Sequence, residues 1–302
     1  MEFSFIFQNL INGLTIGAMY ALMALGYTLV YNASRLVNFS QSESYMLGAF
    51  GTLIVFSSLG ISATNMPYLG AIIAALVAIV ISSALGSATE RFVFRPLRSA
   101  PKLIPVIASL GLSIAIQNTT LNLAGAGFNN VPQLWPSSGI MLGEVRISIL
   151  QLVIFSLGLL LMVALDIFLN KTLLGKAVRA VAQDLVTARL MGISSNRVIF
   201  SIFIVASCLS GISGFLVALY YGSINFYMGF QAGISGFAAA ILGGFGNVRG
   251  AIAGGLLLGV FEAFGSVFVA SEWKSVIAHA LILLVLILRP QGIFGKLAPE
   301  KL

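Results

Sequence analysis

Long stretches without charged residues, separated by short charged clusters, dominate the pattern of this chain. The charge-free stretches cover residues 3–34, 44–89, 103–143, 147–165 and 198–248. Because about 20 apolar residues cross a bilayer as a helix, several of these stretches are long enough to cross more than once. The pattern predicts membrane crossings near residues 8–31, 39–59, 67–89, 103–123, 148–170, 198–219, 230–247, 251–269 and 274–289.

The last three predicted crossings are short, so a re-entrant segment among them would reduce nine crossings to eight. We therefore expect an all-α integral membrane protein, a polytopic helix bundle of about 8–9 transmembrane helices. Residues 1–302 are expected to form a single transmembrane domain. Composition supports this class, since 59% of residues are hydrophobic and 8% are charged, whereas a soluble domain has about a quarter charged residues.

The formal net charge of +7 follows the predicted topology. With these crossings, all Lys and Arg residues except Arg146 and Lys274 fall on one side of the membrane. Positive residues favour cytoplasmic loops, which predicts an inner-membrane protein with its N-terminus outside and its C-terminus in the cytoplasm. This placement explains the basic residues better than nucleic-acid binding does, so we expect no nucleic-acid partner.

Catalytic and metal-binding motifs are incomplete in this sequence. Cys208 is the single cysteine, and His279 lies in a predicted crossing without a second ligand type nearby. The Gly175-Lys176 pair lacks the upstream glycine and the Ser or Thr of a phosphate-binding loop. We expect no enzyme activity, cofactor or metal, and any ATP that drives this protein must be hydrolysed on another chain.

A group of polar residues near the start of the second predicted crossing is the strongest candidate for a transport pathway or gate. If Arg35 marks the membrane edge, Glu43 lies about 12 Å inside, at 1.5 Å per residue. Ionisable groups at such depth usually face a bundle interior or an aqueous cavity. The alternatives are an ion pair with Arg35 or a loop near the surface. The candidates for the pathway or gate are Asn38, Gln41, Ser42, Glu43, Tyr45, Gln117, Asn118 and Glu262.

Glycine pairs spaced four residues apart occur in the predicted crossings, for example Gly13 with Gly17 and Gly255 with Gly259. Such pairs let helix backbones approach closely in lipid. We expect most of them to serve helix packing and the remainder to act as hinges.

The longest predicted cytoplasmic connection covers residues 171–197 and has the pattern of a helix. Apolar residues alternate with charged ones from residue 177 to residue 190, and Gly192 is a plausible helix end. Such a helix in a chain without a soluble domain suggests a partner protein. An amphipathic helix held at the surface by anionic membrane lipid is the alternative.

Residues 10–22, LINGLTIGAMYAL, and residues 35–39, RLVNF, have a distinctive order of small and polar positions. Together they resemble the opening of permeases from the branched-chain amino acid ABC transporter family, of the LivH type. The resemblance continues at residues 108–118, 175–193, 239–251 and 289–295.

This resemblance implies a fold similar to type II ABC importers and the role of a permease for small amino-acid-like solutes, with branched-chain amino acids expected first. It implies two cytoplasmic ATPase subunits, a second permease that is related or identical, and an extracytoplasmic solute-binding protein. The segment at residues 171–197 would then dock on the ATPase. The residues expected to couple there are Arg179, Gln183, Asp184, Arg189, Met191 and Gly192.

The sequence departs from the family pattern just before Glu43. The family commonly has Ala-His-Gly where this chain has Ser40-Gln41-Ser42. This difference leaves open the same importer class with urea, amides or aromatic acids as its solute. A self-sufficient channel or secondary carrier is a further alternative, although it would call for more paired charges inside the membrane.

Overall fold

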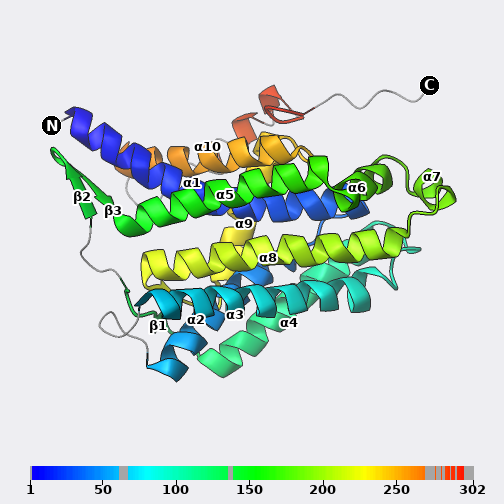
Figure 1. The fold of residues 1–302 in the computed structure, drawn as a ribbon, viewed down its shortest axis with the longest axis horizontal. Helices are drawn as coiled ribbons and strands as arrows, with labels where there is room; N and C mark the ends of the chain where they lie inside the picture. The colour runs from blue at the N-terminus through cyan, green and yellow to red at the C-terminus, as the bar shows by residue number, and fades with distance from the viewer. Residues whose placement is uncertain are drawn as a thin grey trace.

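The computed structural model describes residues 2–60, 67–134, 139–268, 276, 280, 283–285, 287–289 and 291–295. Most helices run along the long axis of one bundle (Figure 1). The helices are α1 Glu2–Ser34, α2 Gln41–Leu59, α3 Pro67–Ala88, the π-helix η1 Thr89–Phe94, α4 Leu103–Ala124, α5 Ile149–Lys171, α6 Leu173–Gln183, α7 Leu185–Leu190, α8 Ser195–Tyr221, α9 Met228–Gly243 and α10 Val248–Phe268. Two antiparallel strand pairs complete the fold, β1 Asn129–Asn130 with β4 Ser223–Ile224, and β2 Gly139–Leu142 with β3 Val145–Ser148.

The predicted all-α membrane bundle is confirmed. Six of the described helices, α1, α3, α4, α5, α8 and α10, are long and apolar enough to cross a membrane. The shorter α9 ends at Gly243 and not at the predicted residue 247, because Gly244 and Gly246 adopt positive φ and Asn247 caps α10 through its side-chain oxygen. Half of the residues in the predicted crossing at 274–289, including His279, lie outside the described residues.

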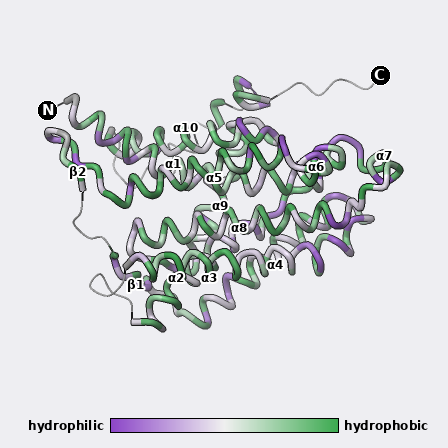
Figure 2. The backbone as a smooth tube through the Cα atoms, viewed as in Figure 1, coloured by the Kyte–Doolittle hydropathy of each residue, from purple (hydrophilic) through white to green (hydrophobic). Residues whose placement is uncertain are grey.

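The two ends of the bundle differ in polarity, and we name them by their elements. The hairpin end carries the first residues of α1, the β2–β3 pair and the β1–β4 pair (Figure 1). The basic end carries α6, α7 and the connection at residues 95–102. Hydrophilic positions gather at the basic end, whereas the middle of the bundle is largely hydrophobic (Figure 2).

Helices α1 and α8 form the centre of the bundle, and α4 lies at its edge. We compared the apolar 18-residue stretch of each helix. In α1, 89% of this stretch is buried, and in α8, 83% is buried, whereas in α4 only 22% is buried. A helix that is apolar on all sides can face lipid, so the exposed apolar surface of α4 fits a membrane protein.

Glycines bring α1 and α10 into backbone contact, as the sequence predicted. A Cβ atom added at Gly259 would lie 2.3 Å from the Cα atom of Gly17, and one added at Gly255 would lie 2.4 Å from the Cα atom of Ala21. Such close approach supplies van der Waals contact where lipid provides no hydrophobic drive.

Gly259→Val is therefore expected to prevent most of the protein from folding, because the added side chain must push α10 away from α1. The matched control is Gly111→Val in α4, where no atom lies within 4 Å of an added Cβ. Both variants place the same side chain in a helix, so a difference between their yields reports the packing at Gly259. The yield is the amount of monodisperse protein after size-exclusion chromatography in detergent. Equal yields of the two variants would contradict this account.

Candidate functional site

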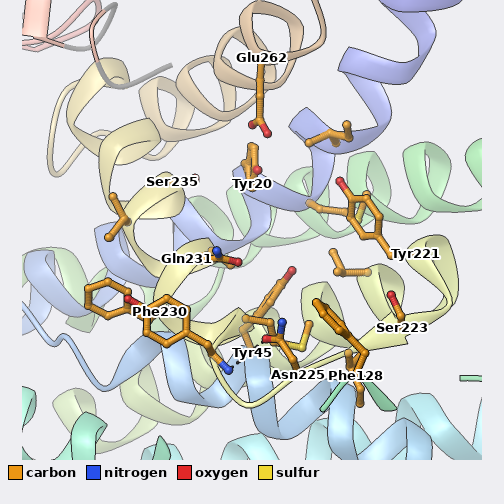
Figure 3. Close-up of a pocket in the computed structure, with 18 residues that line it drawn as sticks. Tyr20, Tyr45, Phe128, Tyr221, Ser223, Asn225, Phe230, Gln231, Ser235 and Glu262 are labelled. Atoms are coloured by element: carbon orange, nitrogen blue, oxygen red, sulfur yellow. Dashed lines mark hydrogen bonds between the residues drawn. The ribbon is translucent and has the colours of Figure 1, made fainter. Parts of the chain in front are cut away.

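A cavity of about 550 Å³ opens among α1, α2, α8, α9 and α10, next to the strand β4 near the hairpin end (Figure 3). This volume lies in the range of pockets that hold small ligands. Aromatic side chains form much of its wall, and they are Tyr20, Tyr45, Phe128, Tyr221, Tyr227 and Phe230. We call this cavity the vestibule.

Among the described residues, 18 line the vestibule, and Glu262 is the only Asp, Glu, Lys or Arg in that set. Its carboxylate comes from α10 and lies beside the hydroxyl of Tyr20, which is its hydrogen-bond partner (Figure 3). Side chains that can donate or accept hydrogen bonds lie around the rest of the cavity, and they are Ser223, Asn225, Gln231 and Ser235. The described part of the vestibule therefore combines apolar surface, a few polar groups and one acidic side chain.

Two of the predicted pathway residues, Tyr45 and Glu262, meet in the vestibule although they are more than 200 positions apart in sequence. Sequence reasoning missed Tyr20, Tyr221, Asn225 and Gln231. Each is a single polar or aromatic residue in an apolar surrounding, and such residues are also common in membrane interfaces. Only the arrangement of the helices shows that they face one cavity.

Glu43 lies on α2 just beyond Tyr45 toward the basic end, and the structure buries it completely. Its Oε1 atom accepts hydrogen bonds from Ser113 Oγ at 2.7 Å, Gln117 Nε2 at 2.9 Å and Ser42 Oγ at 3.2 Å. The Ser42 hydroxyl has one proton and also lies 2.8 Å from the carbonyl oxygen of Phe39, so Ser113 and Gln117 are the donors that offset part of the cost of removing the carboxylate from water. Glu43 thus joins α2 to α4.

Both alternatives for Glu43 are wrong in this structure. Arg35 donates a hydrogen bond to the carbonyl oxygen of Ala182 in α6, and within the described part of the chain it forms no salt bridge with Glu43. A surface loop is excluded because Glu43 has no exposed surface. The acid is instead a buried element of the helix bundle.

The other predicted pathway residues lie in different surroundings. Asn38 accepts a hydrogen bond from Ser40 Oγ at 2.7 Å, and Gln41 Nε2 donates to Ser210 Oγ in α8 at 2.8 Å. Neither residue lines the vestibule. Asn118 is exposed and donates to the carbonyl oxygen of Ile114 in its own helix, so the structure places it apart from Gln117 and Glu43.

An aromatic cluster lies between the vestibule and the basic end. Phe237 in α9 has its ring centroid 5.7 Å from Tyr27, 5.7 Å from Phe39 and 5.5 Å from Phe245, and Phe245 lies 4.5 Å from Tyr31. Tyr20 lines the vestibule, and Tyr27 and Tyr31 follow it along α1 toward the end of this helix at Ser34. The cluster therefore lies on the side of the vestibule that faces the basic end. We call these five residues the aromatic closure.

The sequence predicted one continuous coupling helix, and this prediction is wrong, because the structure has two helices there, α6 and α7. Asp184 separates α6 from α7 because it is extended at φ −152° and caps α7. Its Oδ1 atom accepts hydrogen bonds from the backbone N–H groups of Val186 at 2.9 Å and Thr187 at 3.2 Å. A capping Asp of this kind typically stabilises a helix start by about 1 kcal/mol.

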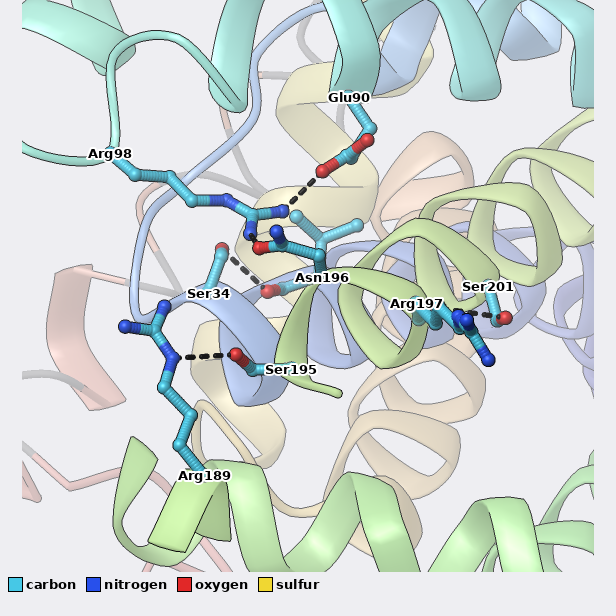
Figure 4. A network of polar contacts seen from close by, with 9 residues as sticks. Ser34, Glu90, Arg98, Arg189, Ser195, Asn196, Arg197 and Ser201 are labelled. Atoms are coloured by element: carbon cyan, nitrogen blue, oxygen red, sulfur yellow. Dashed lines mark hydrogen bonds and ion pairs between the residues drawn. The ribbon is translucent and has the colours of Figure 1, made fainter. Parts of the chain in front are cut away.

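The remaining coupling candidates lie around these two helices. Gln183 ends α6, Arg179 donates to Asn170 Oδ1 at 2.8 Å, and Gly192 ends the segment with φ 82°. Arg189 Nε donates to Ser195 Oγ at the start of α8, at 2.8 Å (Figure 4). Met191 is 78% exposed, next to Leu190, which is 82% exposed.

A polar network connects this segment to the bundle at the basic end (Figure 4). Arg98 pairs with the buried Glu90 of η1 and donates to Asn196 at the start of α8. Asn196 follows Ser195, the partner of Arg189. Movement of α7 can therefore reach α8 and η1 through direct side-chain contacts.

Residues 9–286 match the model of the family described as branched-chain amino acid transport system / permease component. The chain is 40% identical to the high-affinity branched-chain amino acid transport system permease protein BraD of Pseudomonas aeruginosa, over 97% of each chain. It is 37% identical to the corresponding protein LivH of Escherichia coli over 99% of each chain, and 31% identical to LivM of the same organism over 47% of this chain and 34% of LivM.

The family match covers α1 to α10 and therefore every helix that builds the vestibule. Its relatives at 37–40% identity extend over nearly the full length. This chain belongs to the family of branched-chain amino acid transport system permease components.

Proposed function

We propose that this chain is the membrane-spanning permease subunit of an ATP-driven importer, and that branched-chain amino acids pass through it. The observation that carries the proposal is the vestibule, a cavity of solute size enclosed by the helices of a chain that matches the permease family from residue 9 to residue 286. Its apolar wall suits an aliphatic side chain, and its polar groups suit the charged end of an amino acid.

The names of the similar proteins favour branched-chain amino acids over urea, amides or aromatic acids. The departure of Gln41 from the family pattern does not weaken this choice. Gln41 bonds to Ser210 and lies outside the lining of the vestibule, so an exchange at this position leaves the walls of the cavity unchanged.

We place the hairpin end outside the inner membrane and the basic end in the cytoplasm. The positive residues of α6, α7 and the connection at 95–102 support this orientation, since cytoplasmic loops are enriched in Lys and Arg. The vestibule then faces the side from which a solute-binding protein delivers its ligand, and the aromatic closure separates the solute from the cytoplasm.

The cytoplasmic ATPase subunits would bind at α7 and at the end of α6 that adjoins it. Leu190 and Met191 support this role, because two neighbouring apolar side chains that are about four-fifths exposed at a polar end gain free energy when a partner covers them. The hydrogen bond from Arg35 to Ala182 joins α6 to the end of α1, next to Tyr31 of the aromatic closure. Rotation of α6 would thus move α1 and open the closure, as in rocking-bundle transport.

A second permease completes the assembly in this proposal. Escherichia coli has two distinct permease proteins of one named transport system, and this chain is similar to both. We therefore expect a heterodimer of related permeases, two ATPase subunits, an extracytoplasmic solute-binding protein and a belt of membrane lipid.

Purification of the tagged chain from its native membranes tests this assembly. We expect a second permease and an ATPase to elute with it in mild detergent, and we expect proteoliposomes that contain this chain alone to take up no leucine. A chain that purifies alone and still concentrates leucine would support the self-sufficient carrier and contradict the importer.

A further inference from the structure

We infer that Glu43 is a second binding position for the solute, and that the ammonium group of the solute pairs with its carboxylate on the way from the vestibule to the aromatic closure. In the structure α9 covers this acid, so the pairing requires the start of α9 to move away from α2. The inference rests on the proposed function and deepens it, because it names the route of the solute and the chemical group that is recognised there.

One oxygen of the Glu43 carboxylate is left without a partner. Its Oε1 atom accepts hydrogen bonds from Ser113 and Gln117 of α4. The Oε2 atom is buried and has no hydrogen-bond partner within the described part of the chain, and neither salt bridge there involves Glu43. A buried acceptor without a donor costs free energy. Any state that brings a donor to Oε2 therefore gains free energy relative to this one.

The free oxygen faces a glycine of α9. A Cβ atom added at Gly229 would lie 3.1 Å from Glu43 Oε2 and 3.0 Å from Met46 Cβ. One turn further along α9, a Cβ atom added at Gly233 would lie 2.6 Å from Ser42 Cβ. The backbone of α9 thus packs directly on α2 and covers the carboxylate without supplying a donor to its free oxygen.

The contact between α2 and α9 runs from the vestibule to the aromatic closure. Met228 and Ala232 of α9 line the vestibule, as does Tyr45 of α2. Further along α9, Phe237 belongs to the aromatic closure. Glu43 lies beside the first turn of α9, between these two regions. A solute that moves between α2 and α9 toward the closure must therefore pass the carboxylate.

Helix α9 is held at its end and not at its start. The backbone N–H groups of Ile293 and Phe294 donate to the carbonyl oxygens of Leu242 and Gly243, at 2.8 Å and 3.1 Å. At the other end the N-cap residue, Tyr227, provides no side-chain hydrogen bond to the helix. We therefore expect α9 to tilt about its end, a hinge movement that separates its first turns from α2.

The ammonium group is the part of an amino acid that fits the free oxygen. It carries a positive charge and three N–H donors, and hydrogen bonds between ionised groups are roughly twice as strong as neutral ones. A ligand shifts a conformational equilibrium only through a difference in its affinity for the two states. Because Oε2 is covered when α9 is in place and accessible when α9 has moved, pairing with the ammonium group supplies this difference.

The test follows a cysteine between α2 and α9 in the assembled importer. Met46→Cys replaces a side chain that has no exposed surface and lies against Gly229, and Cys208→Ser removes the only native cysteine of this chain. N-ethylmaleimide reaches the new cysteine when α9 separates from α2. Leucine at millimolar concentration should raise the labelling rate roughly tenfold, which corresponds to about 1.4 kcal/mol. Isopentylamine should act like leucine, whereas 4-methylpentanoate, which lacks the ammonium group, should have no effect.

Two further changes in this background separate binding from packing. Glu43→Gln keeps the shape of the side chain and an acceptor for Ser113 and Gln117 but removes the carboxylate, so the response to leucine should disappear while the midpoint of thermal unfolding changes little. Gln117→Leu is the matched control, because it removes one hydrogen bond of Glu43 but leaves Oε2 in place. It should lower the midpoint and keep the response to leucine.

Two results would overturn the inference. One is a labelling rate that leucine leaves unchanged when Glu43 is present, or that 4-methylpentanoate raises as much as leucine does. The other is a full response to leucine in the Glu43→Gln protein.

The importer proposal can fail independently of this inference. If leucine and isopentylamine open the contact only when Glu43 is present, but the assembly shows no ATP-dependent leucine uptake, the ammonium site stands and the importer does not. If uptake requires ATP and is equally fast in the Glu43→Gln protein, the importer stands and the binding role of Glu43 is wrong.

Discussion

Replacing Leu190 and Met191 together by Asp is expected to release the ATPase from the purified complex and to abolish ATP-driven uptake. Both side chains are about four-fifths exposed at the tip of α7, where the chain by itself leaves them in water. Burying an apolar side chain of this size contributes about 1.5–3 kcal/mol. Losing two such contacts, and placing two charges at the interface, should weaken the association at least about 100-fold, since 1.4 kcal/mol corresponds to a factor of ten.

The control for this change is Leu173→Asp, because Leu173 is equally exposed, at 83%, but begins α6 next to the membrane helix α5. It should retain the ATPase. Asp184→Asn should retain it as well, since Asn also caps a helix start, whereas Asp184→Lys removes the cap and reverses the charge and should reduce solute-stimulated ATP hydrolysis. Normal coupling in the Leu190→Asp, Met191→Asp protein would show that the ATPase docks elsewhere.

Glu43→Leu is expected to lower both stability and uptake strongly. The substitution leaves the hydrogen-bond donors of Ser113 and Gln117 without their acceptor inside the bundle, whereas Ser42 keeps the carbonyl oxygen of Phe39 as its acceptor. Each unsatisfied donor costs about 1–3 kcal/mol, so the loss of the acceptor for two donors should lower the free energy of unfolding by roughly 2 kcal/mol or more. The midpoint of thermal unfolding in detergent and the rate of leucine uptake measure the two effects.

Two further variants separate the structural role of Glu43 from a role in the pathway. Glu43→Gln keeps an acceptor oxygen and the shape of the side chain but removes the charge, so it should fold and still alter transport. Gln117→Leu should destabilise the protein more than Asn118→Leu, because Asn118 faces away from Glu43. Normal transport together with normal stability in the Glu43→Gln protein would leave the acid with a packing role only.

The helix bundle could be predicted from the sequence because charge and apolarity report directly on the membrane. Long apolar stretches located most helices to within a few residues, and the glycine pairs of α1 and α10 marked a real backbone contact. The break at Asp184 escaped prediction, since an Asp in an amphipathic pattern fits a helix surface as well as a cap. The early end of α9 depended on positive φ at Gly244 and Gly246, which no periodicity reveals.

The candidate site was only partly accessible from the sequence. Glu43 and Glu262 were recognisable because carboxylates inside apolar stretches are costly and rare. Their separate positions, Glu262 in the vestibule and Glu43 behind it against α4, depend on how α2, α4 and α10 pack. Tyr20 and Gln231 became candidates only when the bundle placed them around the same cavity.

The most direct test of the central claim is leucine uptake into proteoliposomes that contain this chain with its second permease, ATPase subunits and solute-binding protein. The account predicts accumulation that requires ATP and disappears when the ATPase is inactivated by mutation or when the Leu190→Asp, Met191→Asp protein replaces the wild type. Accumulation that persists without ATP hydrolysis, or an assembly that hydrolyses ATP but accumulates no leucine, would contradict it.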